Sequence, residues 1–363
     1  HAQHQRALLS GNLGLLPRAD MAEFPLRDHN QEDYWNVGNS GGRMLVIKRG
    51  LPGTITDDAA GAEELIKGVL TTDLKIVTRM LNGVAAEDKG KYDVMHLAIG
   101  MSKFRALKRV YDLLERYSDH FPRVRQLVYN PEDTRVGNRL ATTNSPTDQM
   151  DKMQLLRQYY DTHIGLKPDE GELKTLLDNY RAAITRAVDE ADTVLVNSFG
   201  NEQEEIETYR QAGFSHDDFI SLFNMTGEAL DDAVIHVAAS NPNNTVMDLS
   251  DDGISTSSMP GTNTALPTIA APGHRVFVTI PAHEDERARN ISMNGTSPAT
   301  ALTVGAVAMA RMASGGKLSA RDTVRLVKRT AYQHTDLTRR QMGAGLLDFE
   351  KLLTEAERVR NAE

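Results

Sequence analysis

Short apolar runs alternate along this chain with longer segments of helical period, and this alternation restricts the possible folds most strongly. Residues 193–196 and 234–239 are short and almost wholly apolar, which is typical of strands buried on both faces of a parallel sheet. A helical pattern over 172–190 leads into the first of them, and another over 62–70 separates the strand-like runs 44–47 and 74–77. The sequence therefore predicts an α/β fold with a mostly parallel central sheet and helices on both faces.

Residues 84–174 do not follow this alternation. Strand-like runs at 94–99 and 125–129 stand beside helical patterns over 104–117 and 150–163, and we interpret the region as a helical insertion packed on the main sheet. A mainly helical pattern also covers 214–230. The predicted organisation is an N-terminal extension over 1–42, a main domain over 43–350 that carries the insertion, and a C-terminal helical tail over 351–363.

Composition excludes several classes of function. The chain has no cysteine, which rules out thiolate nucleophiles, disulfides and cysteine zinc sites. Its formal charge of −9 argues against broad binding to nucleic acid or anionic membranes, and its apolar runs are too short to span a bilayer. The lack of cysteine favours a bacterial secreted or periplasmic protein. We expect no cofactor.

The most specific chemical signal is the run Asn-Gly-Thr-Ser-Pro-Ala-Thr at 294–300, which opens a small-residue helix over 301–313. A serine there, Ser297, would lie at a helix N-terminus, where free N–H groups and the helix dipole favour a developing negative charge. The alternative is that the hydroxyl groups only cap the helix. The run alone does not decide between these two interpretations.

The run at 294–300 is one of five short segments whose order along the chain is informative. They are Val-Leu-Val-Asn-Ser-Phe-Gly at 194–200, the strand-like run ending in Ser-Asn at 234–241, Ala-Ala-Pro-Gly at 270–273, the run at 294–300, and Met-Gly-Ala-Gly-Leu-Leu-Asp at 342–348. This ordered set resembles the subtilisin-like serine peptidases, the subtilase family. The resemblance implies a three-layer subtilisin-like fold and a peptide or protein as substrate.

Carried over residue by residue, the resemblance assigns roles to nine positions. Ser297 matches the nucleophile and Asn241 the side chain that stabilises the tetrahedral oxyanion. The strand that pairs with the substrate backbone corresponds to Ser198, Phe199 and Gly200. The walls of the specificity pocket correspond to Ala238, Ala239 and Ser240. Lys48, after the strand-like run 44–47, stands where the family has its acid.

The chain differs from the family at the position of the catalytic base as well as at the position of the catalytic acid. No histidine lies between His29 and His96, although the family has one at the start of the corresponding helix. Three hypotheses remain: the domain is an inactive peptidase relative, Lys48 acts directly on Ser297, or a histidine of the insertion supplies the base. The candidates for that histidine are His96, His120 and His163.

We therefore expect a subtilisin-like serine peptidase that acts on extended peptides through Ser297. The alternative is a catalytically inactive relative that binds peptides or a protein partner. A structure should place Ser297 at a helix N-terminus with Asn241 facing the same pocket, and Lys48 at the carboxyl end of a core strand.

Overall fold

A four-stranded parallel sheet forms the centre of the computed structural model, which describes residues 55–129, 146–241, 258–280 and 289–362. Its strands lie in the order β1 (Val94–Leu97), β2 (Val194–Ser198), β3 (Val234–Ser240) and β4 (Ile269–Pro272). Every neighbouring pair is parallel, so all four carboxyl ends lie at one edge. The predicted α/β fold with a parallel sheet is confirmed.

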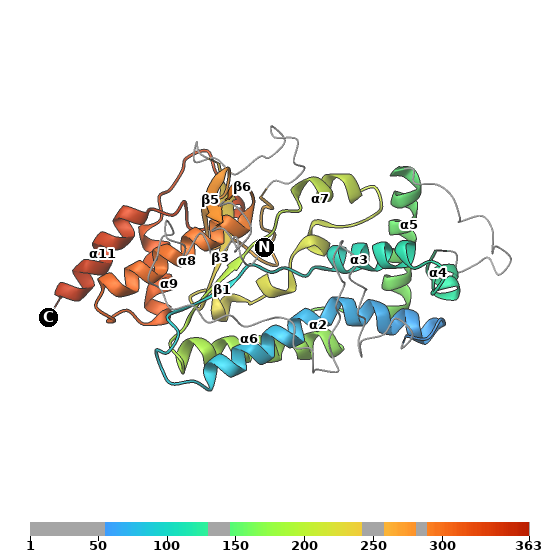
Figure 1. Cartoon of the computed structure of the whole chain (residues 1–363), viewed down its shortest axis with the longest axis horizontal. Helices are drawn as coiled ribbons and strands as arrows, with labels where there is room; N and C mark the ends of the chain where they lie inside the picture. Colours follow the sequence, from blue (N-terminus) through green and yellow to red (C-terminus); the bar gives the residue numbers. More distant parts are fainter. Residues whose placement is uncertain (1–54, 130–145, 242–257, 281–288, 363) are drawn as a thin grey trace.

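Helices cover both faces of this sheet (Figure 1). On one face α8 (Thr296–Ala313) packs across all four strands, and its buried alanines and Gly305 allow a close approach. On the other face α6 (Gly171–Asp189) packs against β2, and α2 (Ala59–Ala85) runs along α6. Three short 3₁₀ turns follow α7 (Gln203–Tyr209) in the chain: η4 (His216–Phe219), η5 (Leu222–Asn224) and η6 (Glu228–Leu230).

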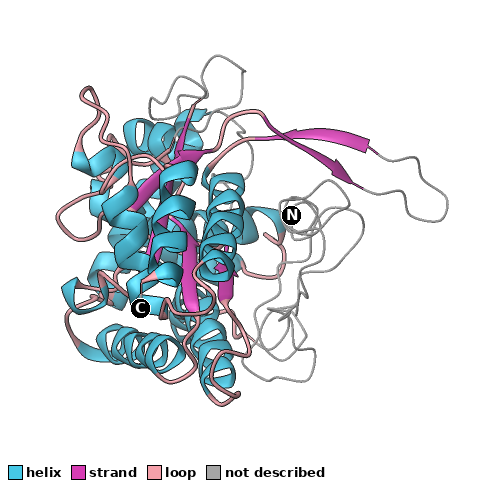
Figure 2. Ribbon diagram, turned by 90° about the vertical axis from the view of Figure 1, so that its left-hand side faces the viewer, coloured by secondary structure: helices cyan, strands magenta, loops and turns pink. Residues whose placement is uncertain are grey.

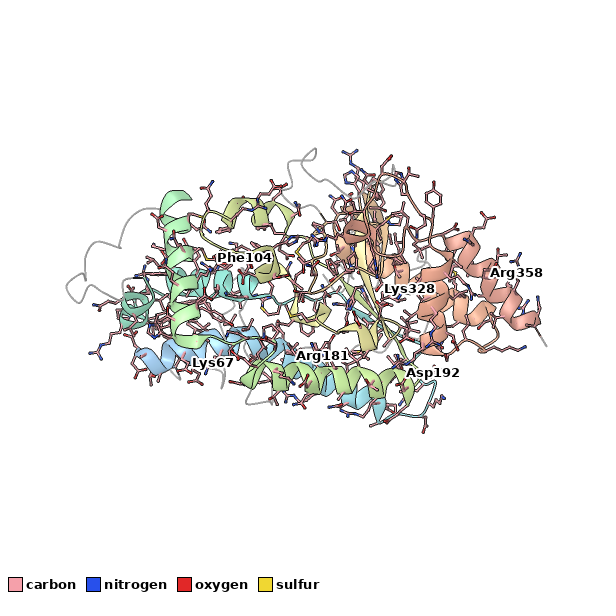
Figure 3. The ribbon with its side chains drawn as sticks, turned by 180° about the vertical axis from the view of Figure 1, so that it is seen from behind. Lys67, Phe104, Arg181, Asp192, Lys328 and Arg358 are labelled. Carbon is pink, nitrogen blue, oxygen red and sulfur yellow. The ribbon has the colours of Figure 1, made fainter. Side chains whose placement is uncertain are left out.

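A helical lobe lies at the end of α2 that is distant from the C-terminus (Figure 1). It contains α3 (Lys103–Arg116), α4 (Pro122–Tyr129) and α5 (Pro146–Tyr159), which continues into one π-helical turn, η3 (Tyr160–Ile164). Phe104 of α3, labelled in Figure 3, stacks on Phe219 with ring centroids 4.3 Å apart and also contacts Tyr209, at the end of α7 (Gln203–Tyr209). One apolar core therefore runs from the lobe to the sheet.

Strand β1 lies inside the range 84–174 and pairs with β2. This part of the predicted insertion contributes a strand to the main sheet, while α3, α4 and α5 build the lobe. The division of the chain into an extension, a main domain and a tail stays a prediction.

Two predicted strands are helical, and both predictions are wrong for a physical reason. Residues 74–77 belong to the 27-residue α2, where Leu74, Ile76 and Val77 are buried against α6 and the lobe. Residues 125–129 belong to α4, whose first turn is held by Asp57: its carboxylate accepts the N–H groups of Arg123 and Val124. The run 214–230 forms the three 3₁₀ turns instead of one helix. The strand predicted at 44–47 lies outside the described residues.

The C-terminal part adds a ribbon and three helices. Strands β5 (Val276–Ile280) and β6 (Arg289–Met293) pair antiparallel and extend from the body, as Figure 2 shows. Helices α9 (Ala320–Thr330), α10 (Arg339–Met342) and α11 (Phe349–Asn361) follow, and α11 packs on α8 and α9. Within the described ranges, no helix has both the length and the apolar character needed to cross a membrane.

Candidate functional site

The serine singled out by the sequence lies in the first turn of α8. Ser297 is half-buried and follows Thr296, whose N–H donates to the Asn201 side-chain oxygen at 2.8 Å. Gly295, with φ of 114°, faces the same asparagine: a Cβ there would lie 3.0 Å from Asn201 Nδ2. The residues after β2 therefore hold the start of α8, and a glycine before the helix is needed for this close approach.

Ser297 lines a small pocket at the carboxyl ends of β1 and β2. Ligands of open parallel α/β sheets bind at this edge. Five parts of the chain contribute the walls. They are the residues after β1 (Ala98, Gly100), the start of α3 (Ser102, Arg105), residues 198–202 at and after the end of β2, Phe219 with Ser221, and the start of α8 (Thr296, Ser297).

An ion pair forms one wall of this pocket. The Glu202 carboxylate pairs with the Arg105 guanidinium and also accepts the N–H of Asn201 at 2.9 Å. The Glu202 side chain is 7% exposed and that of Arg105 is 37% exposed. Arg105 Nη1 also donates to the Gly100 carbonyl at 3.2 Å. Sequence reasoning missed both roles; the available signal was that Glu202 comes two residues after the Ser-Phe-Gly run.

The predicted peptide-pairing strand is partly engaged within the protein. Ser198, Phe199 and Gly200 all contribute to the lining of the pocket, and the Phe199 side chain is fully buried. The Phe199 N–H donates to the Val237 carbonyl at 2.9 Å, and its carbonyl accepts Asn224 Nδ2 at 2.7 Å. Both backbone polar groups of Phe199 are thus already hydrogen-bonded within the protein.

The predicted specificity-pocket residues Ala238, Ala239 and Ser240 are buried at the end of β3 and are not among the described residues that line the pocket. Asn241 follows them directly and is half-buried. Two backbone hydrogen bonds connect this end of β3 to α8. The Gly273 N–H donates to the Ser240 carbonyl at 2.9 Å, and the Gly295 N–H donates to the Gly273 carbonyl at 2.8 Å.

Of the three candidate histidines, His96 lies in β1, two residues before Ala98. Burial lowers the pKa of His96 to about 4, and its Nε2 has no hydrogen-bond partner among the described residues. His120 and His163 are exposed on the helical lobe, in ring contact with Tyr117 and Tyr159. The described lining of the pocket includes no histidine. Lys48 lies outside the described residues.

A comparison with known protein families agrees with the motif order, the parallel sheet and the serine at the start of α8. The sequence model of the subtilase family matches residues 164–345, which is half of the chain. The chain belongs to the subtilase family. The match includes β2, β3, β4 and α8 and ends three residues before the N-cap of α11, so most of the helical lobe lies outside it.

Several solved structures are similar to this chain at low sequence identity. The epidermin leader peptide processing serine protease of Staphylococcus aureus is 19% identical, with a TM-score of 0.37, over 52% of this chain and 46% of its own. The A-subunit of the AB5 toxin of E. coli is 19% identical, with a TM-score of 0.38, over 57% and 67%. MycP1 of Mycobacterium smegmatis is 17% identical, with a TM-score of 0.34, over 60% and 58%. The chain thus spans less than half of the first of these. Among curated proteins, none matches the chain.

A metal site is not formed by the part of this subtilase-family chain that the structure describes, because no three histidine or acidic side chains gather there in a way that could hold an ion. Asp58, for example, caps α2 by accepting the Gly61 N–H at 2.9 Å. The described lining of the pocket offers hydroxyl groups, backbone N–H groups and one ion pair.

Proposed function

We propose that this chain binds an extended peptide across the carboxyl ends of β1 and β2, with Ser297 facing the peptide and with little or no hydrolysis. The observation that carries the proposal is the Arg105–Glu202 pair beside Ser297. A serine hydroxyl is a poor nucleophile without an adjacent base. Glu202 is the ionisable acid in the described lining, and its carboxylate is already engaged by Arg105 and Asn201.

The end of β1 supports the same proposal. The family has its acid at the end of a core strand, before a glycine, and β1 is followed by Ala98, Ile99 and Gly100. Ala98 lines the pocket and has no ionisable group. If either Lys48 or Ala98 stands at the position of the acid, that position carries no carboxylate. Without it, a base next to Ser297 would lack the group that orients it.

Peptide hydrolysis through Ser297 is the second candidate. It is favoured by the half-exposed position of Ser297 in the first turn of an 18-residue helix, where free N–H groups can stabilise an oxyanion. Asn241 would add a side-chain donor, whose removal typically costs about 10²- to 10³-fold in rate. The base would come from a residue outside the described ranges, such as Lys48, or from a histidine.

Fluorescein-labelled casein tests the two candidates on the full chain. We expect wild type and Ser297→Ala to bind it equally in fluorescence anisotropy, without cleavage and without labelling of wild type by a fluorophosphonate probe. Ser297→Trp, which fills the pocket, should weaken binding about tenfold or more, whereas Ser292→Trp on the exposed face of β6 should not. Cleavage and labelling that vanish in Ser297→Ala would establish hydrolysis, and failure of wild type to bind would overturn both candidates.

A further inference from the structure

Two buried hydroxyl groups in the lining of the pocket have no hydrogen-bond partner among the described residues. Ser198 is 7% exposed and Thr296 is 1% exposed, and both line the pocket that contains Ser297. A buried polar group that makes no hydrogen bond costs free energy, and nearly all such groups in proteins are paired. Their place in one pocket therefore points to a ligand that supplies the missing partner.

Several acceptor atoms of the pocket are already in use. The Gly100 carbonyl accepts Arg105 Nη1 at 3.2 Å, and the Asn201 side-chain oxygen accepts the Thr296 N–H at 2.8 Å. Ser221 Oγ accepts two backbone N–H groups, at 3.1 and 3.3 Å. A serine oxygen that accepts still has one proton to donate. The groups left over in the lining are thus mainly donors.

The charge in the pocket favours the same kind of ligand. In the pair of Arg105 and Glu202, the carboxylate is 7% exposed and the guanidinium is 37% exposed. A guanidinium has five N–H donors, and the described contacts of Arg105 use only its two terminal nitrogens, toward Glu202 and the Gly100 carbonyl. A group that enters the pocket therefore meets the positive member of the pair.

The start of α8 adds one more donor. The Thr296 N–H is bonded to Asn201, and Pro298 has no N–H. The N–H of Ser297 lies in the first turn, where the helix offers it no partner, and it makes no hydrogen bond with a described residue. The helix dipole adds a partial positive charge at this end.

We infer that this pocket binds a carboxylate group of the peptide, held by the Arg105 guanidinium, the Ser198 hydroxyl and the Ser297 N–H. The inference rests on the proposed function and names the chemical class of its ligand, a peptide with an acidic side chain or a free C-terminus. An ionised carboxylate only accepts hydrogen bonds and carries one negative charge. A phosphate group, with nearly two charges, would exceed the single cation that Glu202 already shares.

Two matched pairs of fluorescein-labelled hexapeptides, bound to the full chain in fluorescence anisotropy, test the inference. The members of one pair differ only in a free or an amidated C-terminus. The members of the other are both amidated and carry either aspartate or asparagine at one internal position. In at least one pair the carboxylate member should bind about tenfold or more tightly than the amide member, because charge-assisted hydrogen bonds are strong. The pair that shows the difference identifies the source of the carboxylate.

Variants of the full chain locate the carboxylate in the pocket. Ser198→Ala should reduce the preference for the carboxylate about three- to tenfold with an unchanged urea midpoint, because its hydroxyl makes no hydrogen bond with a described residue. Arg105→Gln should remove most of the preference, and Ser292→Ala on exposed β6 should keep it. If Arg105→Gln does not fold, as judged by urea titration, Ser198→Ala decides the outcome.

The outcomes separate the inference from the proposed function. Equal binding of the acid and amide members in both pairs, with casein still bound, would overturn the carboxylate site and leave the peptide site standing. A preference that stays unchanged in the folded variants would show that the carboxylate binds elsewhere and would also overturn the inference. Failure of wild type to bind every peptide and casein would overturn the proposed function itself.

Discussion

The Gly295 N–H donates to the Gly273 carbonyl at 2.8 Å, and this single bond joins the turn after β4 to the residue that precedes α8. The contact is so close that a Cβ on Gly273 would lie 2.5 Å from Gly295 O and 2.6 Å from Ala239 Cβ. Two glycines therefore set the position of the helix that presents Ser297.

Gly273→Ala should displace the start of α8. The added methyl group meets backbone and a buried alanine that cannot move aside, so we expect a loss of about 3 kcal/mol in the free energy of unfolding, with weaker casein binding. Urea titration measures the first effect. Gly83→Ala in α2, where no atom lies within 4 Å of the new Cβ, is the control and should be neutral or slightly stabilising. Equal losses for the two variants would contradict the close-approach argument.

Asn201 should act as a hydrogen-bond acceptor for the first turn of α8. Asn201→Ala removes the acceptor of the Thr296 N–H and should cost about 1 kcal/mol of stability, as loss of a helix cap does. Asn201→Asp keeps an oxygen in the same place and should retain most of that stability. The comparison of the two urea midpoints is the measurement, and an Asp variant as unstable as the Ala variant would argue against the acceptor role.

The Arg105–Glu202 pair should respond asymmetrically to substitution. Arg105→Ala leaves a buried carboxylate without its cation and should cost about 2–3 kcal/mol, while Glu202→Gln leaves a guanidinium that is already 37% exposed and should cost about 1 kcal/mol. The double variant should cost less than the sum of the two. A double-mutant cycle by urea unfolding measures these differences; the reverse order of the single variants would show that Glu202 is hydrated.

The stability of the protein should fall in acid because two histidines of the sheet, the half-buried His96 and the buried His236, have their pKa values lowered. Burial lowers the pKa of both His96 and His236 to about 4, so the folded state keeps them neutral when the unfolded state binds protons. Stability is thus complete above about pH 6.5 and decreases as the pH falls toward 4, by at most about 3 kcal/mol for each histidine. Free energies of unfolding between pH 7.5 and 4.5 would show this slope. His236→Gln should reduce it and the exposed His120→Gln should not.

The sequence predicted the elements whose pattern is local. The apolar runs at β2 and β3 and the small-residue helix α8 are where the alternation and the Gly-Thr-Ser run indicated. Residues 74–77 have the same apolar character, yet they are helical because α2 buries them against α6, a contact that depends on a segment about one hundred residues later.

Some residues of the candidate site could be predicted from short motifs, and others are brought together only by the folded structure. Ser297, Ser198 and Gly200 meet in one pocket, and short motifs had pointed to each of them. Arg105 and Glu202 are 97 positions apart, and only the packing of α3 beside the end of β2 makes them partners.

Phe104 and Arg105 are neighbours at the start of α3, and their side chains make contacts with different parts of the molecule. The ring of Phe104 is fixed against Phe219, while the guanidinium of Arg105 reaches the pocket that contains Ser297. The helical lobe therefore cannot shift against the sheet without moving the positive charge beside that serine. A molecule that binds α3 on the lobe side and displaces it would thereby move the Arg105 guanidinium relative to Ser297 without entering the pocket.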